Sequence, residues 1–342
     1  MKKQLLALAV GSLVALPSIA LADMGPTVYG KINLSYENQD DGTNDEWKLE
    51  SNASRLGVKG DLDLDVDQLK AVYQAEFQIA VDDGDNGGQT FSQRNIFGGF
   101  EHATLGRLIA GKFDTPFKQS QGEIDQFGDL RGDINNIVGG SERVSNIVQY
   151  STPKLADALT VNVALIPGEG STVGNERRDS VADGYSSSVV FDNGMIYGSV
   201  GYDSEVNTTL YDYAAISGDK TLVDAFHVAG KVNIKNIEIG ALYQQSENSD
   251  SKVDGGDFKD TTVILSGAIN LDRVKLKAQY GQTDLDFVDD KLKLMAVGAD
   301  YKLAKASKVF AYYSKVESDA SVDQGGIEDS TFGVGFEHKF SM

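Results

Sequence analysis

The chain has 342 residues, of which 51 are acidic and 31 are lysine or arginine, so its formal charge at neutral pH is −20. A surface this acidic disfavours nucleic acid as a partner, because the phosphates would be repelled. The sequence contains no cysteine, which excludes disulfides, zinc–thiolate sites and thiol nucleophiles.

The first 22 residues have the features of a secretory signal peptide. Lys2 and Lys3 precede an apolar run over residues 5–16, and Ala20-Leu21-Ala22 supplies a small-x-small cleavage pattern. The apolar run is too short to span a bilayer. We therefore expect cleavage after Ala22 and an exported mature domain over residues 23–342, with 29 basic and 51 acidic residues and a charge of −22. The 37 glycines and 5 prolines of the whole chain favour strands joined by tight turns.

From residue 28 onward, apolar and polar residues alternate along successive short segments. In the first segment, Val28, Ile32 and Leu34 share one face while Lys31 and Asn33 share the other. Alternate residues of a strand point to opposite faces, so this period indicates β-structure. Counting all such segments predicts roughly sixteen strands of about ten residues each, the length that crosses a bilayer at a tilt. The pattern recurs over residues 55–64, 70–81, 159–165, 237–244, 273–280 and 331–340.

Short and long connections alternate between these segments. Short turns are expected near residues 65–67, 192–194, 235–236, 271–272 and 304. Long polar connections are expected at 37–54, 82–90, 113–142, 167–183, 203–222, 247–260, 284–290 and 317–329. Short periplasmic turns and long external loops are typical of an outer-membrane barrel. The sequence therefore predicts an all-β fold, a transmembrane sixteen-stranded antiparallel barrel.

The volume of such a barrel determines which face meets the membrane. Sixteen strands enclose more space than their apolar side chains could fill, so the apolar face must meet lipid and the polar face must line water. Closing the sheet also leaves no unpaired strand edge in hydrocarbon. Tyrosine and phenylalanine residues near the strand ends suit the two interfacial girdles of a membrane protein.

The alternation stops between Gly111 and Arg143. A long connection of this kind within a compact domain is often functional. We expect it to be a third loop folded into the barrel, where it narrows a water-filled pore. Its acids would then face bases of the wall and set a transverse field for sorting solutes. The alternative is that the acids only form a solvated surface. The acidic candidates are Glu123, Asp125, Asp129 and Asp133, and the basic candidates are Lys31, Arg55, Arg94 and Arg143.

Several local motifs together resemble the general trimeric porins of proteobacterial (Gram-negative) outer membranes, over the whole mature chain. The resemblance implies a homotrimer in outer-membrane lipid and lipopolysaccharide, with passive diffusion of ions and small hydrophilic solutes. It also implies that Glu123 and Asp125 face the four bases, and that residues 82–90 latch onto a neighbouring subunit. One departure is that Phe340, instead of ending the chain, is followed by Ser341 and Met342. The motifs are Val28-Tyr29-Gly30-Lys31, Ser54-Arg55-Leu56-Gly57-Val58-Lys59-Gly60, Gln93-Arg94, Gly111-Lys112-Phe113-Asp114-Thr115-Pro116-Phe117-Lys118 and Arg143-Val144-Ser145-Asn146.

Other kinds of function have weaker support. Residues 83–94 lack the ligands of a calcium loop, although loose divalent-cation binding by loop acids stays open. His102, His227 and His338 have no metal-site spacing and no evident catalytic partner, so we expect no cofactor, no metal and no enzyme. A substrate-selective channel and a structural or adhesive surface barrel remain alternatives. For a general pore, the acidic external loops predict a modest cation preference.

Overall fold

The structure is a computed structural model that describes residues 25–82, 90–173, 176–249, 256–320 and 326–342. The expected signal peptide, and all but the ends of the expected latch at 82–90, lie outside these residues. The described chain is mostly strand. The elements are β1 Thr27–Asp40, β2 Asp45–Ser51, β3 Arg55–Asp63, β4 Leu69–Ile79, β5 Phe91–His102, β6 Gly106–Asp114, α1 Pro116–Gln119, η1 Ile134–Asn136, β7 Arg143–Ser151, β8 Leu159–Ile166, β9 Ser171–Val173, β10 Glu176–Arg178, β11 Gly184–Asp192, β12 Ile196–Thr208, α2 Tyr211–Ser217, β13 Thr221–Ile234, β14 Ile237–Asn248, β15 Lys259–Leu271, β16 Val274–Leu285, β17 Asp290–Ala304, β18 Ser307–Ser318 and β19 Glu328–Ser341.

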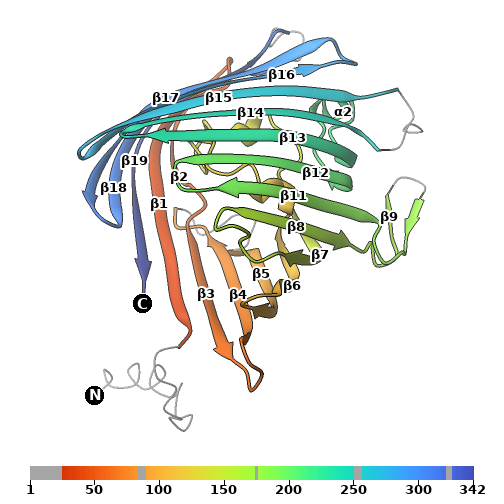
Figure 1. Ribbon diagram of the computed structural model, residues 1–342. Helices are drawn as coiled ribbons and strands as arrows, with labels where there is room; N and C mark the ends of the chain where they lie inside the picture. The colour runs from red at the N-terminus through yellow and green to blue at the C-terminus, as the bar shows by residue number, and fades with distance from the viewer. Residues whose placement is uncertain (1–24, 83–89, 174–175, 250–255, 321–325) are drawn as a thin grey trace, which may run out of the picture.

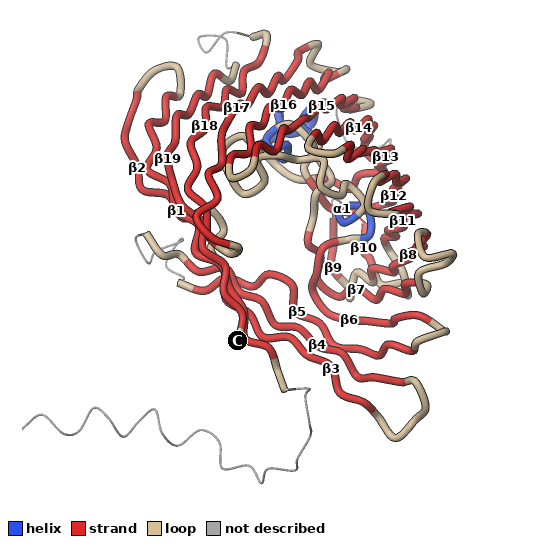
Figure 2. The backbone as a smooth tube through the Cα atoms, turned by 60° about the vertical axis from the view of Figure 1, so that its left-hand side comes forward, coloured by secondary structure: helices blue, strands red, loops and turns tan. Residues whose placement is uncertain are grey.

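All strands except the β9–β10 hairpin form one closed antiparallel sheet. Each strand of the wall pairs with its neighbours in the chain, and β1 pairs with β19 to close the ring (Figures 1 and 2). The sheet contains 17 strands, but β2 and β3 both pair with β1 and are separated only by residues 52–54, where Ala53 has a φ of 47°. They are two halves of one interrupted strand, so the wall has sixteen. The predicted sixteen-stranded antiparallel barrel is confirmed.

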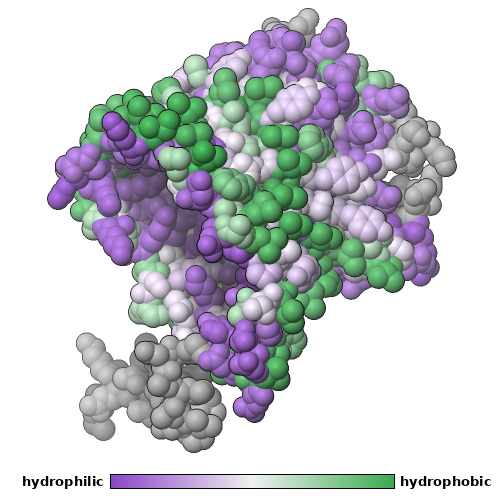
Figure 3. All heavy atoms as spheres, in the orientation of Figure 1, coloured by the Kyte–Doolittle hydropathy of each residue, from purple (hydrophilic) through white to green (hydrophobic). Residues whose placement is uncertain are grey.

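The two faces of the wall differ as the alternation predicts. In β14, Ile239 and Tyr243 point outward and are 60% and 40% exposed, whereas Gln244 and Ser246 on the other face are buried. In β1, Lys31 and Asn33 are likewise buried on the inner face. Hydrophobic residues gather across the middle of the outer surface between hydrophilic ends (Figure 3). A band of this kind is what a lipid-facing wall requires.

Short and long connections separate to the two ends of the barrel. The short turns comprise residues 64–68, 103–105, 193–195, 235–236, 272–273 and 305–306. The other end carries the longer segments, including 115–142, the β9–β10 hairpin and α2 (Figure 1). The expected long first loop at 37–54 is wrong, because β1 continues to Asp40 and β2 begins at Asp45 across from it. Polar residues there belong to a two-stranded extension of the wall.

Part of the inner face is apolar, which the sequence patterns did not indicate. Leu242, Ile264, Leu292 and Leu294 of β14, β15 and β17 point inward and are buried in one cluster. An apolar patch facing water would be unfavourable, so something must cover it. No helix among the described residues is both long and apolar enough to cross a membrane.

Candidate functional site

Residues 115–142 contain two short helical turns with ordered starts. Thr115 caps α1, where its Oγ1 accepts a hydrogen bond from the Lys118 amide at 3.1 Å, and Pro116 occupies the first helical position. Asp133 caps η1 in the same way, accepting from the Asn135 amide at 2.8 Å. The segment is therefore a folded connection with defined side-chain directions. We call it the β6–β7 loop.

Apolar side chains of the β6–β7 loop cover the apolar patch inside the barrel. Ile124 and Ile137 are fully buried against Leu242, Ile264 and Leu294. Two further contacts extend this packing. Phe127 packs with Ala296, Phe310 and Tyr312, and Phe117 packs with Leu210, Val223 and Phe258. Burying each large apolar side chain contributes roughly 1.5–3 kcal/mol, so these contacts hold the loop strongly.

Polar side chains of the wall satisfy the loop's backbone. A connection with little secondary structure leaves carbonyl groups without partners, and these need donors when they are buried. The wall supplies them from β15 and β16. Ser266 donates to the Ile124 carbonyl at 2.5 Å, Lys277 to Gln126 at 2.9 Å, Gln279 to Gly132 at 3.1 Å and Thr283 to Ile137 at 2.6 Å.

Asp129 contacts two bases on β1 and β3, the strands that follow β19 around the ring. Its Oδ2 lies 2.5 Å from Lys31 Nζ and 2.6 Å from Arg55 Nη2. Burial alone would raise the pKa of Asp129, but the two cations outweigh burial and hold that pKa below its usual value. The loop thus reaches from the β13–β18 side, where it is anchored, to the first strands of the wall (Figure 2).

Asp125 and Asp133 have a different environment. Asp125 accepts from the Phe127 amide at 2.8 Å, and Asp133 accepts from the Asn135 and Asp129 amides at 2.8 and 2.9 Å. Burial raises the pKa of both carboxyl groups, and for Asp125 the nearby Asp133 raises it further. These two acids shape the loop's turns and make no ion pair among the described residues.

The remaining predicted residues pair with groups that the sequence did not single out. Glu123 lies 2.7 Å from Lys231 of β13, and its side chain is 89% exposed. Two bases pair within the wall. Arg94 Nε lies 2.9 Å from Glu76, and Arg143 Nη2 lies 3.0 Å from Asp114. The loop acid that contacts Lys31 and Arg55 is Asp129. That Glu123 and Asp125 face the four bases across a pore stays a prediction.

The arrangement of wall and loop can be compared with known proteins. A family model described as Gram-negative porin matches residues 7–341. The chain belongs to the Gram-negative porin family. This porin is 24% identical over 400 aligned residues to an outer membrane porin protein of Bordetella pertussis, covering 99% of this chain and 100% of that one. It is thus an outer-membrane channel for passive diffusion of solutes.

Solved structures share the fold of this porin. An anion-selective porin from Comamonas acidovorans superposes with a TM-score of 0.77 at 23% identity, covering 93% of this chain and 100% of that chain. OmpT of Vibrio cholerae, solved in a trimer form, superposes with a TM-score of 0.66 at 18% identity, covering 93% and 99%. At these identities the similarity shows the barrel fold and leaves individual side chains to be argued from this chain.

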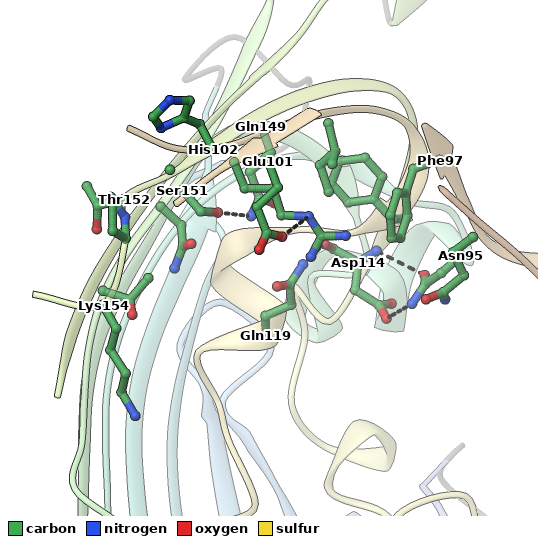
Figure 4. A pocket seen from close by; sticks show the side chains of 18 of the residues that line it. Asn95, Phe97, Glu101, His102, Asp114, Gln119, Gln149, Ser151, Thr152 and Lys154 are labelled. Carbon is green, nitrogen blue, oxygen red and sulfur yellow. Dashed lines mark hydrogen bonds and ion pairs between the residues drawn. The ribbon is translucent and has the colours of Figure 1, made fainter. Parts of the chain in front are cut away.

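A polar cavity of about 610 Å³ lies where α1 approaches strands β4–β8 of the porin (Figure 4). Its lining is dominated by amides and hydroxyls, including Asn95, Gln119, Gln149 and Thr152. Asp114 bridges this lining to the charged wall, because its carboxylate meets both Asn95 and Arg143. The cavity offers water and small solutes hydrogen-bonding groups with few unpaired charges.

Sequence reasoning missed Glu76, Asp114 and Lys231. Glu76 and Lys231 stand on the polar faces of their strands, so alternation places them inside the barrel but does not say which charge each one meets. His227, expected to have no partner, lies 2.9 Å from the Ser120 hydroxyl. No group of three or more histidine or acidic side chains in the described ranges is placed to hold a metal ion.

Proposed function

We propose that this porin is a non-specific diffusion channel for ions and small hydrophilic solutes, narrowed by an inward-folded β6–β7 loop. The observation that carries the proposal is Asp129, held between Lys31 and Arg55 of β1 and β3 while Ile124 and Ile137 pack inside the barrel on β14, β15 and β17. The narrowest part of the channel then lies beside this bridge.

Charges of both signs face each other across that gap. Glu123 and Asp129 supply acids from the loop, and the wall bases Lys31, Arg55, Arg94 and Arg143 stand in or near the gap. Asp125 and Asp133 act by fixing the loop's shape. Low-dielectric walls strengthen the field between such charges, so solutes are sorted by size, charge and dipole.

The exposed charge favours a modest cation preference. The side chains of Lys31, Arg55, Arg94 and Arg143 are 11%, 22%, 13% and 18% exposed and each meets an acid. Glu123 is 89% exposed and is the loop acid that mobile ions reach most freely. We expect Glu123→Gln to lower the cation-to-anion permeability ratio by about twofold, measured as a reversal potential across a salt gradient.

Asp125→Asn is the matched control for this experiment. It removes the same formal charge two residues away, but the side chain faces backbone amides and its raised pKa already reduces its charge. Its reversal potential should stay at the wild-type value. A clear anion preference of the wild type, or equal shifts in the two variants, would refute the assignment to Glu123.

We further propose that the channel is a homotrimer set in outer-membrane lipid and lipopolysaccharide. The trimer form of the Vibrio cholerae OmpT structure supports this assembly. Light scattering of the detergent-solubilised protein should give about three times the mass of one mature chain, which is 36.8 kDa less the 22 residues of the expected signal peptide. A monomer mass in every non-denaturing detergent would contradict it.

We propose that the channel has no enzymatic role. Two serine–histidine pairs among the described residues resemble a nucleophile with its base. Ser307 and His338, 2.7 Å apart, are paired positions of β18 and β19 and form no hydrogen bond or ion pair with an acid in the described ranges. The other pair is Ser120 and His227, 2.9 Å apart. Both side chains are fully buried, the histidine ring lies 4.3 Å from that of Phe117, and its Nδ1 has no hydrogen-bond partner in the described chain. A catalytic pair needs substrate access and an orienting third group. A better reading of the pair is that it anchors the end of α1 to β13.

A further inference from the structure

A second basin, separate from the loop, has an unusual charge for this protein. It measures about 320 Å³ and lies at the short-turn end of β15–β19. Six bases and three acids line it, so its formal charge is +3, whereas the whole chain carries −20. In Figure 3, hydrophilic residues line the hollow at the left end, where the short turns lie. The bases are Arg273, Lys275, Lys302, Lys305, Lys308 and Lys339.

The acids of the basin do not neutralise it. Asp300 is shared by Lys308 at 2.9 Å and by Lys277 at 3.3 Å. Glu337 is shared by Lys339 at 3.3 Å and by Lys31 at 3.6 Å. Asp300 and Glu337 therefore each serve two ammonium groups, and the third acid, Asp272, forms no ion pair in the described chain. Lys275 lies 3.1 Å from Glu238, which is outside the lining. Arg273, Lys302 and Lys305 form no ion pair within the described part of the chain.

The strand register places like charges opposite each other. Lys302 pairs with Lys308 across β17 and β18, and Lys31 pairs with Lys339 across β1 and β19. Like charges at directly opposite positions destabilise a sheet. The register also places Lys275 opposite Asp300 and Lys308 opposite Glu337, and these acids offset part of the repulsion. The excess of bases over acids in the lining therefore points to a negatively charged ligand.

We propose that this basin is a binding site for small phosphate- or carboxylate-bearing anions at the periplasmic end of the channel. Several ammonium groups and one guanidinium around a pocket of this size can each donate to anionic oxygens. The low-dielectric wall raises the local anion concentration. The inference rests on the proposed open channel, because binding in the basin is read from the ion current through it.

The test uses the full-length porin in planar bilayers, with inorganic phosphate as the probe. Phosphate added on the short-turn side should reduce the chloride current and saturate. In the double variant that combines Lys302→Gln with Lys339→Gln, the phosphate concentration that blocks half of the current should be about fivefold higher than in the wild type. The double variant should fold, because Lys302 forms no ion pair in the described chain and Glu337 keeps its ion pair with Lys31 when Lys339 is replaced.

Lys70→Gln is the control, because Lys70 also stands at the short-turn end but on β4, outside the basin, beside Asp61. It should leave the phosphate block unchanged. An equal half-blocking concentration in wild type and double variant, or an equal rise in the control, overturns the binding site. A chain that conducts no ions at all would instead refute the proposed channel. Weaker block in bilayers containing phosphatidylglycerol would assign the basin to a lipid headgroup and overturn the solute site.

Discussion

Replacing Ile124 and Ile137 with alanine should release the β6–β7 loop, raise the single-channel conductance and make the current noisier. Both side chains are fully buried against inward residues of β14, β15 and β17. Shortening a buried isoleucine costs about 2–5 kcal/mol, so the pair removes much of what holds the loop in place. The hydrogen bonds that remain, such as Thr283 to the Ile137 carbonyl, are worth only about 1 kcal/mol each.

The matched control is Ile239→Ala with Ile269→Ala. These isoleucines lie on the outer face of the wall, where they are 60% and 42% exposed. The two substitutions remove the same side-chain volume as the inner pair, but at positions that face lipid. The control should conduct like the wild type. Unchanged conductance in the inner pair, with a normal amount of folded barrel, would show that the loop does not depend on this packing.

Asp129→Asn should shift the ion selectivity toward anions more than any other single substitution in the loop. The change leaves Lys31 and Arg55 without the carboxylate that both now contact at 2.5 and 2.6 Å. We expect the anion-to-cation permeability ratio to rise about threefold, read from the reversal potential. The barrel should still fold, because Lys31 keeps Glu337 at 3.6 Å and Arg55 keeps Glu76 at 3.8 Å.

Asp219→Asn provides the comparison for this shift. Asp219 is exposed between α2 and β13, at the end of the barrel that carries the long connections. The substitution therefore removes the same charge as Asp129→Asn, but away from the proposed gap. Screening at ordinary salt concentrations limits the reach of such a charge to about 10 Å. A shift as large in Asp219→Asn as in Asp129→Asn would mean that selectivity depends on total charge instead of on the bridge.

The wall could be predicted from the sequence because each strand carries its own evidence. The alternation of Val28, Lys31, Ile32 and Asn33 depends only on neighbours in the chain, and the strand geometry converts it into two faces. The number of strands follows from counting the alternating segments, and the sorting of the connections follows from comparing their lengths. The interruption between β2 and β3 and the extension of β1 to Asp40 could not be predicted, because polar strand ends resemble loops.

The site could be predicted only in part because its contacts join distant segments. That Asp129 and Arg55 both face the interior follows from local patterns. That they meet each other depends on how Ile124 and Ile137 seat the loop. The apolar patch on which the two isoleucines pack could not be recognised in the sequence, because Leu242 falls on a strand face otherwise occupied by polar residues such as Gln244.

Chemical modification at position 123 tests the central claim most directly. The chain has no cysteine, so Glu123→Cys supplies a single thiol on the exposed side of the loop. If the loop narrows a water-filled channel, a negatively charged thiol reagent added to an open channel should lower the current in discrete steps. A conducting channel whose current stays unchanged after complete modification would contradict the account.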